Sequence, residues 1–222
     1  MKLLVANWKS NMNLSKVQDW LKEFALTSEE QKYDSTKIEV IIAPSVTFLE
    51  IIKNTGLIVS AQDVSIYEPG AHTGEITAEE LKTFCKYCVV GHSERNEPIE
   101  IVEQKRDICL EHGITPIICF IKPTDAKRLY KPGCVMTLEN PDNISQNGKY
   151  RPDDPVSIKT KVDEVEKLLP TQAKILYGGS VNRQNVSQLV NIKRLDGFLV
   201  GQASLDPLHF FELISAVEVS IS

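Results

Sequence analysis

Short apolar runs alternate with amphipathic stretches along the whole chain. Two of the runs are almost uninterrupted, Val40-Ile41-Ile42-Ala43 and Ile117-Ile118-Cys119-Phe120, and such runs are typical of strands buried on both faces of a parallel sheet. We therefore predict strands at Leu3–Asn7, Glu39–Ala43, Leu57–Ala61, Tyr87–Gly91, Thr115–Phe120, Cys134–Leu138, Lys174–Tyr177 and Gly197–Val200.

Amphipathic helices are predicted between these strands. In three stretches, apolar residues recur with the spacing of one helical face. The second stretch follows Asp153-Asp154-Pro155 and the third follows Pro207, and acidic residues and proline are both favourable where a helix starts. The three apolar stripes are Leu14, Val17, Leu21 and Phe24; Ile158, Val162, Val165 and Leu169; and Leu208, Phe211 and Leu213.

The alternation of strand and helix indicates the fold class. Strand–helix units that follow one another without a break in composition favour an α/β protein with a closed (β/α)8 barrel, the TIM barrel, over an open sheet. The fifth helical region is short, because Thr124–Tyr130 has room for about two helical turns. We found no linker, low-complexity segment or internal repeat, so we expect residues 1–222 to form a single domain.

Composition excludes several classes of partner. The sequence has no apolar run of the ~18 residues that a membrane span needs, and its N-terminal apolar stretch is too short for a signal peptide. We therefore expect a soluble, cytoplasmic protein without a membrane partner. Lysine and arginine form no basic stripe and the formal net charge is −5, so we expect no nucleic-acid partner. An anionic substrate would have to be held by local donors.

The cysteines do not predict a metal site. Cys85 and Cys88 form a single C-x-x-C pair, whereas a zinc site needs a second pair or two suitably spaced histidines. A redox role for this pair is one alternative, and buried, reduced thiols are the other. We favour buried, reduced thiols for the five cysteines Cys85, Cys88, Cys109, Cys119 and Cys134.

Chemically useful side chains follow several of the predicted strands. In barrels of this class, catalytic residues lie at the carboxyl ends of the strands. Lys9, His92 and Glu139 follow the first, fourth and sixth strands, and the glycine turns Gly178-Gly179-Ser180 and Gly201-Gln202 follow the last two. We expect helices to begin at these turns, where backbone N–H groups bind phosphate. The sequence thus predicts a proton-transfer site beside an anion-binding site.

His92 precedes Ser93-Glu94-Arg95, which has the composition of a helix start. The positive end of such a helix disfavours an imidazolium ion. We therefore expect a neutral His92 ring that donates a hydrogen bond.

Four motifs, taken together, resemble the triosephosphate isomerase family, in order and nearly in spacing. The resemblance extends over the whole chain, and Gly70–Glu75 is similar to the loop through which subunits of that family interlock. The four motifs are Asn7-Trp8-Lys9, Gly91-His92-Ser93-Glu94-Arg95, Tyr177-Gly178-Gly179-Ser180-Val181 and Gly197-Phe198-Leu199-Val200-Gly201-Gln202-Ala203-Ser204-Leu205.

The resemblance implies an isomerase that interconverts D-glyceraldehyde 3-phosphate and dihydroxyacetone phosphate through an enediolate, in glycolysis and gluconeogenesis. It implies no metal and no organic cofactor, a phosphorylated triose as substrate, and assembly with itself as a homodimer or a tetramer. The implied catalytic residues are Glu139 as base, His92 as electrophile and Lys9 as the positive charge. The implied substrate-binding residues are Asn7, Lys9, Ser145, Ser180, Gly201 and Gln202, supported by Ser93, Glu94 and Tyr177, with Thr73 and Gly74 in the dimer loop.

The chain departs from the family pattern mainly in the lid loop, Glu139–Gly148. Asp142 occupies the family's tryptophan position and Ser145 its first lid glycine, while Lys122 replaces an acidic residue and Gln202 a glycine. We expect a lid that closes less readily. A non-catalytic phosphate-binding barrel with a degenerated lid is the alternative, and a different phosphosugar enzyme is the third reading.

Overall fold

The computed structural model describes residues 1–143 and 152–221 of the chain. Within them, parallel strands pair in sequence order, and β1 pairs with both β2 and β8, so the sheet closes into a barrel. The predicted fold class is confirmed. The strands are β1 (Lys2–Asn7), β2 (Ile38–Ala43), β3 (Ile58–Ala61), β4 (Tyr87–Val90), β5 (Thr115–Phe120), β6 (Val135–Glu139), β7 (Lys174–Gly178) and β8 (Gly197–Val200).

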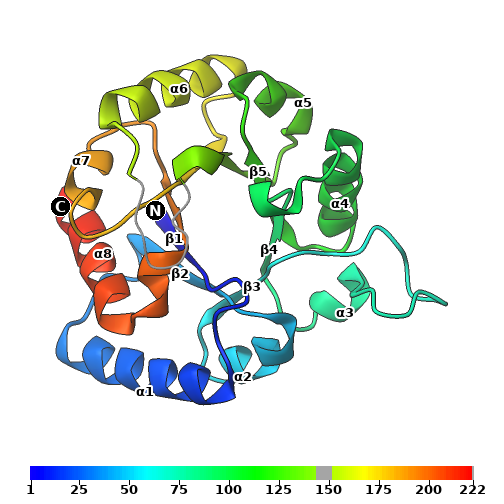
Figure 1. Cartoon of the computed structure of the whole chain (residues 1–222), viewed down its shortest axis with the longest axis horizontal. Helices are drawn as coiled ribbons and strands as arrows, with labels where there is room; N and C mark the ends of the chain where they lie inside the picture. The colour runs from blue at the N-terminus through cyan, green and yellow to red at the C-terminus, as the bar shows by residue number, and fades with distance from the viewer. Residues whose placement is uncertain (144–151, 222) are drawn as a thin grey trace.

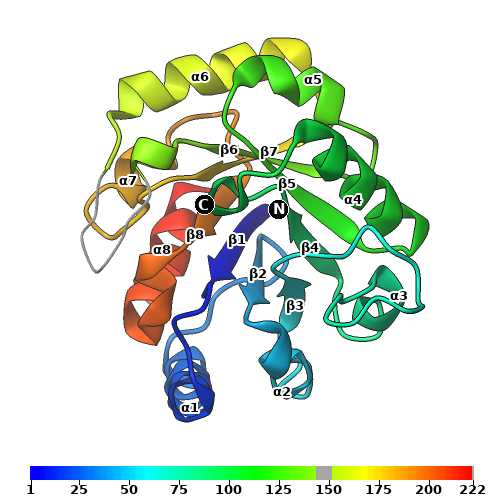
Figure 2. The same cartoon turned by 45° about the vertical axis from the view of Figure 1, so that its right-hand side comes forward.

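Helices form a ring around the barrel (Figure 1), and the turned view shows them outside the strands on every side that it exposes (Figure 2). The α-helices are α1 (Leu14–Glu30), α2 (Leu49–Lys53), α3 (Ala78–Leu81), α4 (Ile99–Glu111), α5 (Ala126–Leu129), α6 (Pro155–Leu168), α7 (Val186–Leu189) and α8 (Pro207–Ser220). Short 3₁₀ turns follow several strands: η1 (Val46–Phe48), η2 (Ser93–Arg95), η3 (Pro123–Asp125), η4 (Pro141–Asn143) and η5 (Gln202–Leu205).

The starts of the long helices are fixed by local side-chain bonds. Asp154 accepts a hydrogen bond from the Ser157 N–H at 3.1 Å, and Asp206 accepts one from the His209 N–H at 2.9 Å. A proline directly follows each of these acidic residues, where its missing N–H costs the helix nothing. The predicted starts of α6 and α8 are therefore confirmed.

The strands have two buried faces, as their continuous apolar runs predict. Leu3 and Val5 belong to a cluster of strand residues inside the barrel. Leu4 and Ala6 alternate with them and pack outward against the helices. All five cysteines are free and buried, as expected.

Two residues of the predicted apolar stripes are not in the core. Leu14 and Leu208 are each 49% exposed, because both lie in the first turn of a helix, before it meets the barrel. In α1 the buried face instead includes Trp20, whose indole N–H donates to the Ser204 carbonyl at 3.0 Å. No described helix is long and apolar enough to span a bilayer.

The segment before α3 forms an extended arm. Residues 67–75 are all exposed, and Figure 1 shows this part of the chain reaching away from the barrel at the right. The rings of Tyr67 and His72 stack within the arm, with centroids 4.1 Å apart. Gly74 adopts φ +92°, a backbone conformation that favours glycine. Thr73 and Gly74 therefore lie on a projecting loop, as predicted.

Candidate active site

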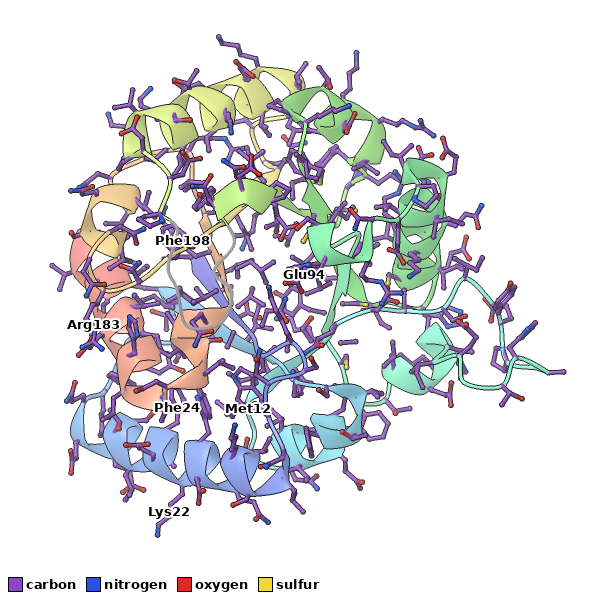
Figure 3. All side chains as sticks on the ribbon, viewed as in Figure 1. Met12, Lys22, Phe24, Glu94, Arg183 and Phe198 are labelled. Carbon is purple, nitrogen blue, oxygen red and sulfur yellow. The ribbon has the colours of Figure 1, made fainter. Side chains whose placement is uncertain are left out.

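The carboxyl ends of the strands bring the predicted chemical groups into one hollow. Because the strands are parallel, each delivers the residues that follow it to the same end of the barrel. In Figure 3, Glu94 lies on the side of η2 that faces the middle of the barrel. The hollow is lined by Asn7, Lys9, His92, Glu139, Gly178, Gly179, Val181, Leu199, Gly201 and Gln202.

Glu139 is the last residue of β6 and is 2% exposed. Its Oε2 accepts a hydrogen bond from the Ser93 N–H at 2.8 Å, and its Oε1 lies 3.2 Å from Nε2 of His92. Burial raises the pKa of Glu139 to about 7, although the bond from the Ser93 N–H and the charge of Lys9 oppose that rise. Such a carboxyl group can accept a proton near neutral pH.

His92 is a neutral hydrogen-bond donor by its geometry. Its Nδ1 accepts the backbone N–H of Glu94 at 3.2 Å, so the ring proton of the neutral form is on Nε2. Burial, followed by the charge of Lys9, lowers the pKa of His92 to about 4. The expected neutral ring therefore fits both the hydrogen bonding and the pKa.

The cause predicted for that neutrality is wrong. The residues after His92 form the single turn η2, and α4 begins only at Ile99. Asn96 adopts a left-handed conformation with φ 50° and Pro98 precedes α4, so the turn cannot continue as a helix. One backbone N–H and burial of the ring take the place of a helix dipole.

Lys9 is held in an uncommon backbone conformation, with φ 50°. Its N–H donates to Oδ1 of Asn7 at 3.1 Å, and its carbonyl accepts bonds from Nε2 of Gln62 at 2.9 Å and Oγ of Ser45 at 3.1 Å. Nζ of Lys9 lies 2.6 Å from Oε1 of Glu94. The predicted partnership of Glu94 with Lys9 is thus present.

Gln62 is a site residue that the sequence analysis missed. Its Nε2 donates to the carbonyls of both Lys9 and Ala43 at 2.9 Å, so it ties the loop after β1 to the end of β2. Gln62 directly follows β3, and the rule that selected Lys9 and His92, the position after a strand, would also have selected it.

The turn after β7 needs its second glycine. A Cβ atom built on Gly179 would lie 2.1 Å from the hydroxyl oxygen of Tyr177, whose side chain is itself buried. Ser180 Oγ donates to the Asn143 carbonyl at 2.6 Å. The hydroxyl of Tyr177 is buried and has no hydrogen-bond partner among the described residues.

The prediction that helices begin at both glycine turns is correct for only one of them. η5 begins at Gln202, directly after Gly201, whereas α7 begins only at Val186. Between Ser180 and α7, Oδ1 of Asn182 accepts the N–H of Gln184 at 2.9 Å, and this local bond bends the chain. Of the other predicted residues, Lys122 is exposed, and Ser145 lies outside the described residues.

Comparison with known proteins agrees with this geometry. The sequence profile of triosephosphate isomerase matches residues 2–131 and 131–217. The chain belongs to the triosephosphate isomerase family. It is 35% identical to the triosephosphate isomerase of Wolbachia pipientis wMel, covering 99% of this chain and 96% of the relative. The enzymes named triosephosphate isomerase from Mycoplasmopsis pulmonis and Aquifex aeolicus are 33% and 30% identical, each covering 96% of this chain and 96% and 98% of the relative.

Of the two lid residues that depart from the pattern of the triosephosphate isomerase family, Asp142 and Ser145, only Asp142 lies within the described residues. Asp142, at the family's tryptophan position, lies in η4 and is exposed. Lys149 and Arg151, the first cations that follow Asp142 in the sequence, lie outside the described residues.

Proposed function

We propose that Glu139, His92 and Lys9 are the groups with which this triosephosphate isomerase interconverts D-glyceraldehyde 3-phosphate and dihydroxyacetone phosphate. The observation that carries the proposal is the pairing of Glu139 with His92. A carboxyl group with a pKa near 7 and an imidazole with a pKa near 4 face each other across 3.2 Å. At neutral pH the first accepts a proton while the second still carries one to donate.

The reaction moves one proton between adjacent carbons. The Glu139 carboxylate removes a proton from the carbon beside the carbonyl, and the electron pair of that C–H bond moves toward the carbonyl oxygen. The Nε2–H of His92 and the Nζ of Lys9 stabilise the resulting enediolate, since both are donors in a buried site. The proton of the neighbouring hydroxyl group is then lost to the former carbonyl oxygen, a transfer in which Nε2 of His92 gives up its proton to one oxygen and regains one from the other. Protonation of the neighbouring carbon by Glu139 gives the isomeric triose, with its carbonyl on the other carbon, and restores the carboxylate.

The ligand-free carboxylate of Glu139 is fully engaged. One oxygen accepts the Ser93 N–H at 2.8 Å, and the other faces Nε2 of His92 at 3.2 Å. A substrate carbonyl that takes the Nε2–H of His92 must displace this second contact. Glu139 then has to turn toward the substrate carbon, so the Ser93 N–H acts as a resting position for the base.

The phosphate group has a set of candidate donors next to the catalytic pair. Asn7 lines the same hollow, and Ser180, Gly201 and Gln202 offer backbone N–H groups at the ends of β7 and β8. Ser145 completes the proposed set. Among the described residues that line this hollow, Lys9 supplies the positive charge.

A non-catalytic phosphate-binding barrel does not account for the buried carboxyl group of Glu139. A protein that only binds a phosphate ligand has no chemical use for a buried carboxyl group whose ionisation is costly, yet Glu139 is 2% exposed. A coupled assay of the purified protein with each triose tests the proposal. Glu139→Gln should reduce kcat by at least ~10²-fold without any loss of stability. A variant that keeps more than about half of the activity would remove Glu139 from the mechanism.

We also propose that the chain works as a homodimer, alone or within a tetramer. A second hollow adjoins the first, and Asn7, Lys9 and His92 line both. The exposed arm that carries Thr73 projects from its own barrel. In the proposed dimer, the partner subunit's Thr73 would enter this second hollow. The variant Thr73→Arg should sediment as a monomer and should be less active than the parent in the coupled assay. A fully active monomer of the unchanged protein at micromolar concentration would contradict the proposal.

We further propose that residues 1–222 act as one domain and that the enzyme works in the cytoplasm. The closure of β8 onto β1 supports the first point, because the barrel needs both ends of the chain.

A further inference from the structure

We infer that Asp153 is a positioning residue for the base: through Asn140, it fixes the backbone directly after Glu139 on the start of α6. This inference rests on the proposed role of Glu139. The contact joins two places thirteen residues apart, because Nδ2 of Asn140 donates to Oδ2 of Asp153 at 2.8 Å.

Asp153 is anchored to the helix as well as to Asn140. Its Oδ1 accepts the N–H of Asp154 at 2.9 Å. Asp154 in turn caps α6 by accepting the Ser157 N–H at 3.1 Å. Both oxygens of Asp153 are thus used, one toward the residue after the base and one toward the helix start. A fourteen-residue helix packed on the barrel through Ile158 is a rigid support for this contact.

Asn140 is the position where such a support is needed. The β6–β7 ladder ends with Glu139 opposite Gly178, so Asn140 is the first residue of this segment outside the sheet. Pro141 restricts Asn140 to extended conformations but does not by itself fix the direction in which the chain leaves the strand. The bond to Asp153 supplies that direction. At the other end of η4, the Asn143 carbonyl is held by Ser180 Oγ at 2.6 Å.

The catalytic consequence follows from the movement that Glu139 has to make. The carboxylate leaves the Ser93 N–H when substrate binds, and its new position must be accurate to about 0.5 Å. A backbone fixed on both sides of Glu139, by the ladder before it and by Asn140 after it, confines that movement to the side chain. Loss of the Asn140–Asp153 bond should therefore lower kcat more than it raises KM.

An exchange of polarity tests the contact. Asn140→Asp places two carboxylates together and breaks the bond, while the double variant Asn140→Asp/Asp153→Asn restores an amide–carboxylate bond in the opposite direction. We expect the single variant to lower kcat about 5- to 20-fold with KM within about twofold, and the double variant to recover kcat to within about twofold of the parent. A merely structural contact would change the melting temperature without this loss and recovery of kcat.

The measurements are made at about pH 9, so that Glu139 is ionised in every variant despite the added charge. Asn191→Asp, the same change at an exposed position, is the control. Asp153→Leu removes the acceptor without adding charge and should lower kcat similarly, which keeps the test valid if Asn140→Asp fails to fold. A kcat for either single variant within about twofold of the parent, or a double variant as slow as Asn140→Asp, would overturn the inference. Activity retained by Glu139→Gln would instead overturn the proposed function.

Discussion

Nε2 of His92 and Oε1 of Glu139 lie 3.2 Å apart, which leaves no room between them for a substrate carbonyl. The contact and a carbonyl bound between the two groups therefore exclude each other, and on the proposed mechanism substrate entry has to separate them. On that mechanism, the two side chains converge where a proton leaves carbon and a negative charge develops on oxygen.

The pH dependence of the free enzyme should follow Glu139. The base works when it is ionised, so with a pKa raised to about 7, kcat/KM should rise with pH up to neutrality and level off above it. His92, with a pKa lowered to about 4, stays neutral over this range. Carbon-13 NMR of the labelled carboxyl group in the free enzyme separates Glu139 from the substrate phosphate. A transition near the ordinary glutamate pKa of about 4.3 would contradict the prediction.

The same burial should cost stability. Because the folded protein holds the Glu139 proton more tightly than the unfolded chain, ionisation destabilises the fold as pH rises from about 4.5 to about 7. Glu139→Gln lacks this cost and should exceed the parent in unfolding free energy by up to about 3 kcal/mol at pH 8, but not at pH 4. Urea denaturation at both pH values, at one protein concentration, gives the difference. Glu29→Gln, an exposed change on α1, should show no such pH dependence.

Gly179→Ala should be poorly tolerated. Its new Cβ would lie 2.1 Å from the Tyr177 hydroxyl oxygen and 2.4 Å from the adjoining ring carbon, and the buried ring has little space to move. We expect a loss of about 1–3 kcal/mol in stability together with a higher KM. Gly70→Ala, on the exposed arm, is the control for stability, since its Cβ would meet Cδ2 of His72 at an ordinary 3.6 Å. Equal melting temperatures for the two variants would show that the β7 turn readjusts freely.

Gln62→Leu should weaken the support of Lys9. The change removes one of the two donors to each of the carbonyls of Lys9 and Ala43, which keep Ser45 Oγ and the Trp8 N–H respectively, so each lost bond should cost about 0.5–1.5 kcal/mol. Because Lys9 is held at φ 50°, its ammonium group should also lose its fixed position, and kcat/KM should fall. Gln62→Glu accepts bonds but cannot donate these two, so it should resemble Gln62→Leu. Steady-state kinetics and thermal unfolding that match the parent in both variants would argue against this role.

The barrel could be predicted from the sequence because its strands are long runs of apolar residues with few interruptions. Their predicted ends differ from the observed ones by one residue at most, as at Glu139, which the ladder to Gly178 keeps in β6. The burial of single helix residues was harder to predict. Leu14 has the right spacing for the core, but the path of the chain into α1 leaves it at the edge.

The chemical groups of the site could be predicted from their positions after strands, whereas their mutual contacts could not. The neutral state of His92 was predicted, but the backbone N–H that fixes its tautomer depends on how η2 turns. Likewise, Asn140 and Asp153 are thirteen residues apart, and no sequence motif at either residue predicts their contact. Contacts of this kind arise from the tertiary structure, which the local pattern of residues does not encode.

The close approach of Tyr177 to Gly179 also constrains how this chain can change over generations. A lineage that carries the tyrosine accepts a larger residue two positions later only with a loss of stability, whereas a lineage that first exchanges the tyrosine for a smaller side chain avoids that loss. The order of the two substitutions therefore matters, because the residue present at one position determines which residues the other position can accept. Once position 179 carries a larger residue, a return of tyrosine at position 177 requires that glycine is first restored at position 179. The first substitution is therefore hard to reverse after the second has occurred.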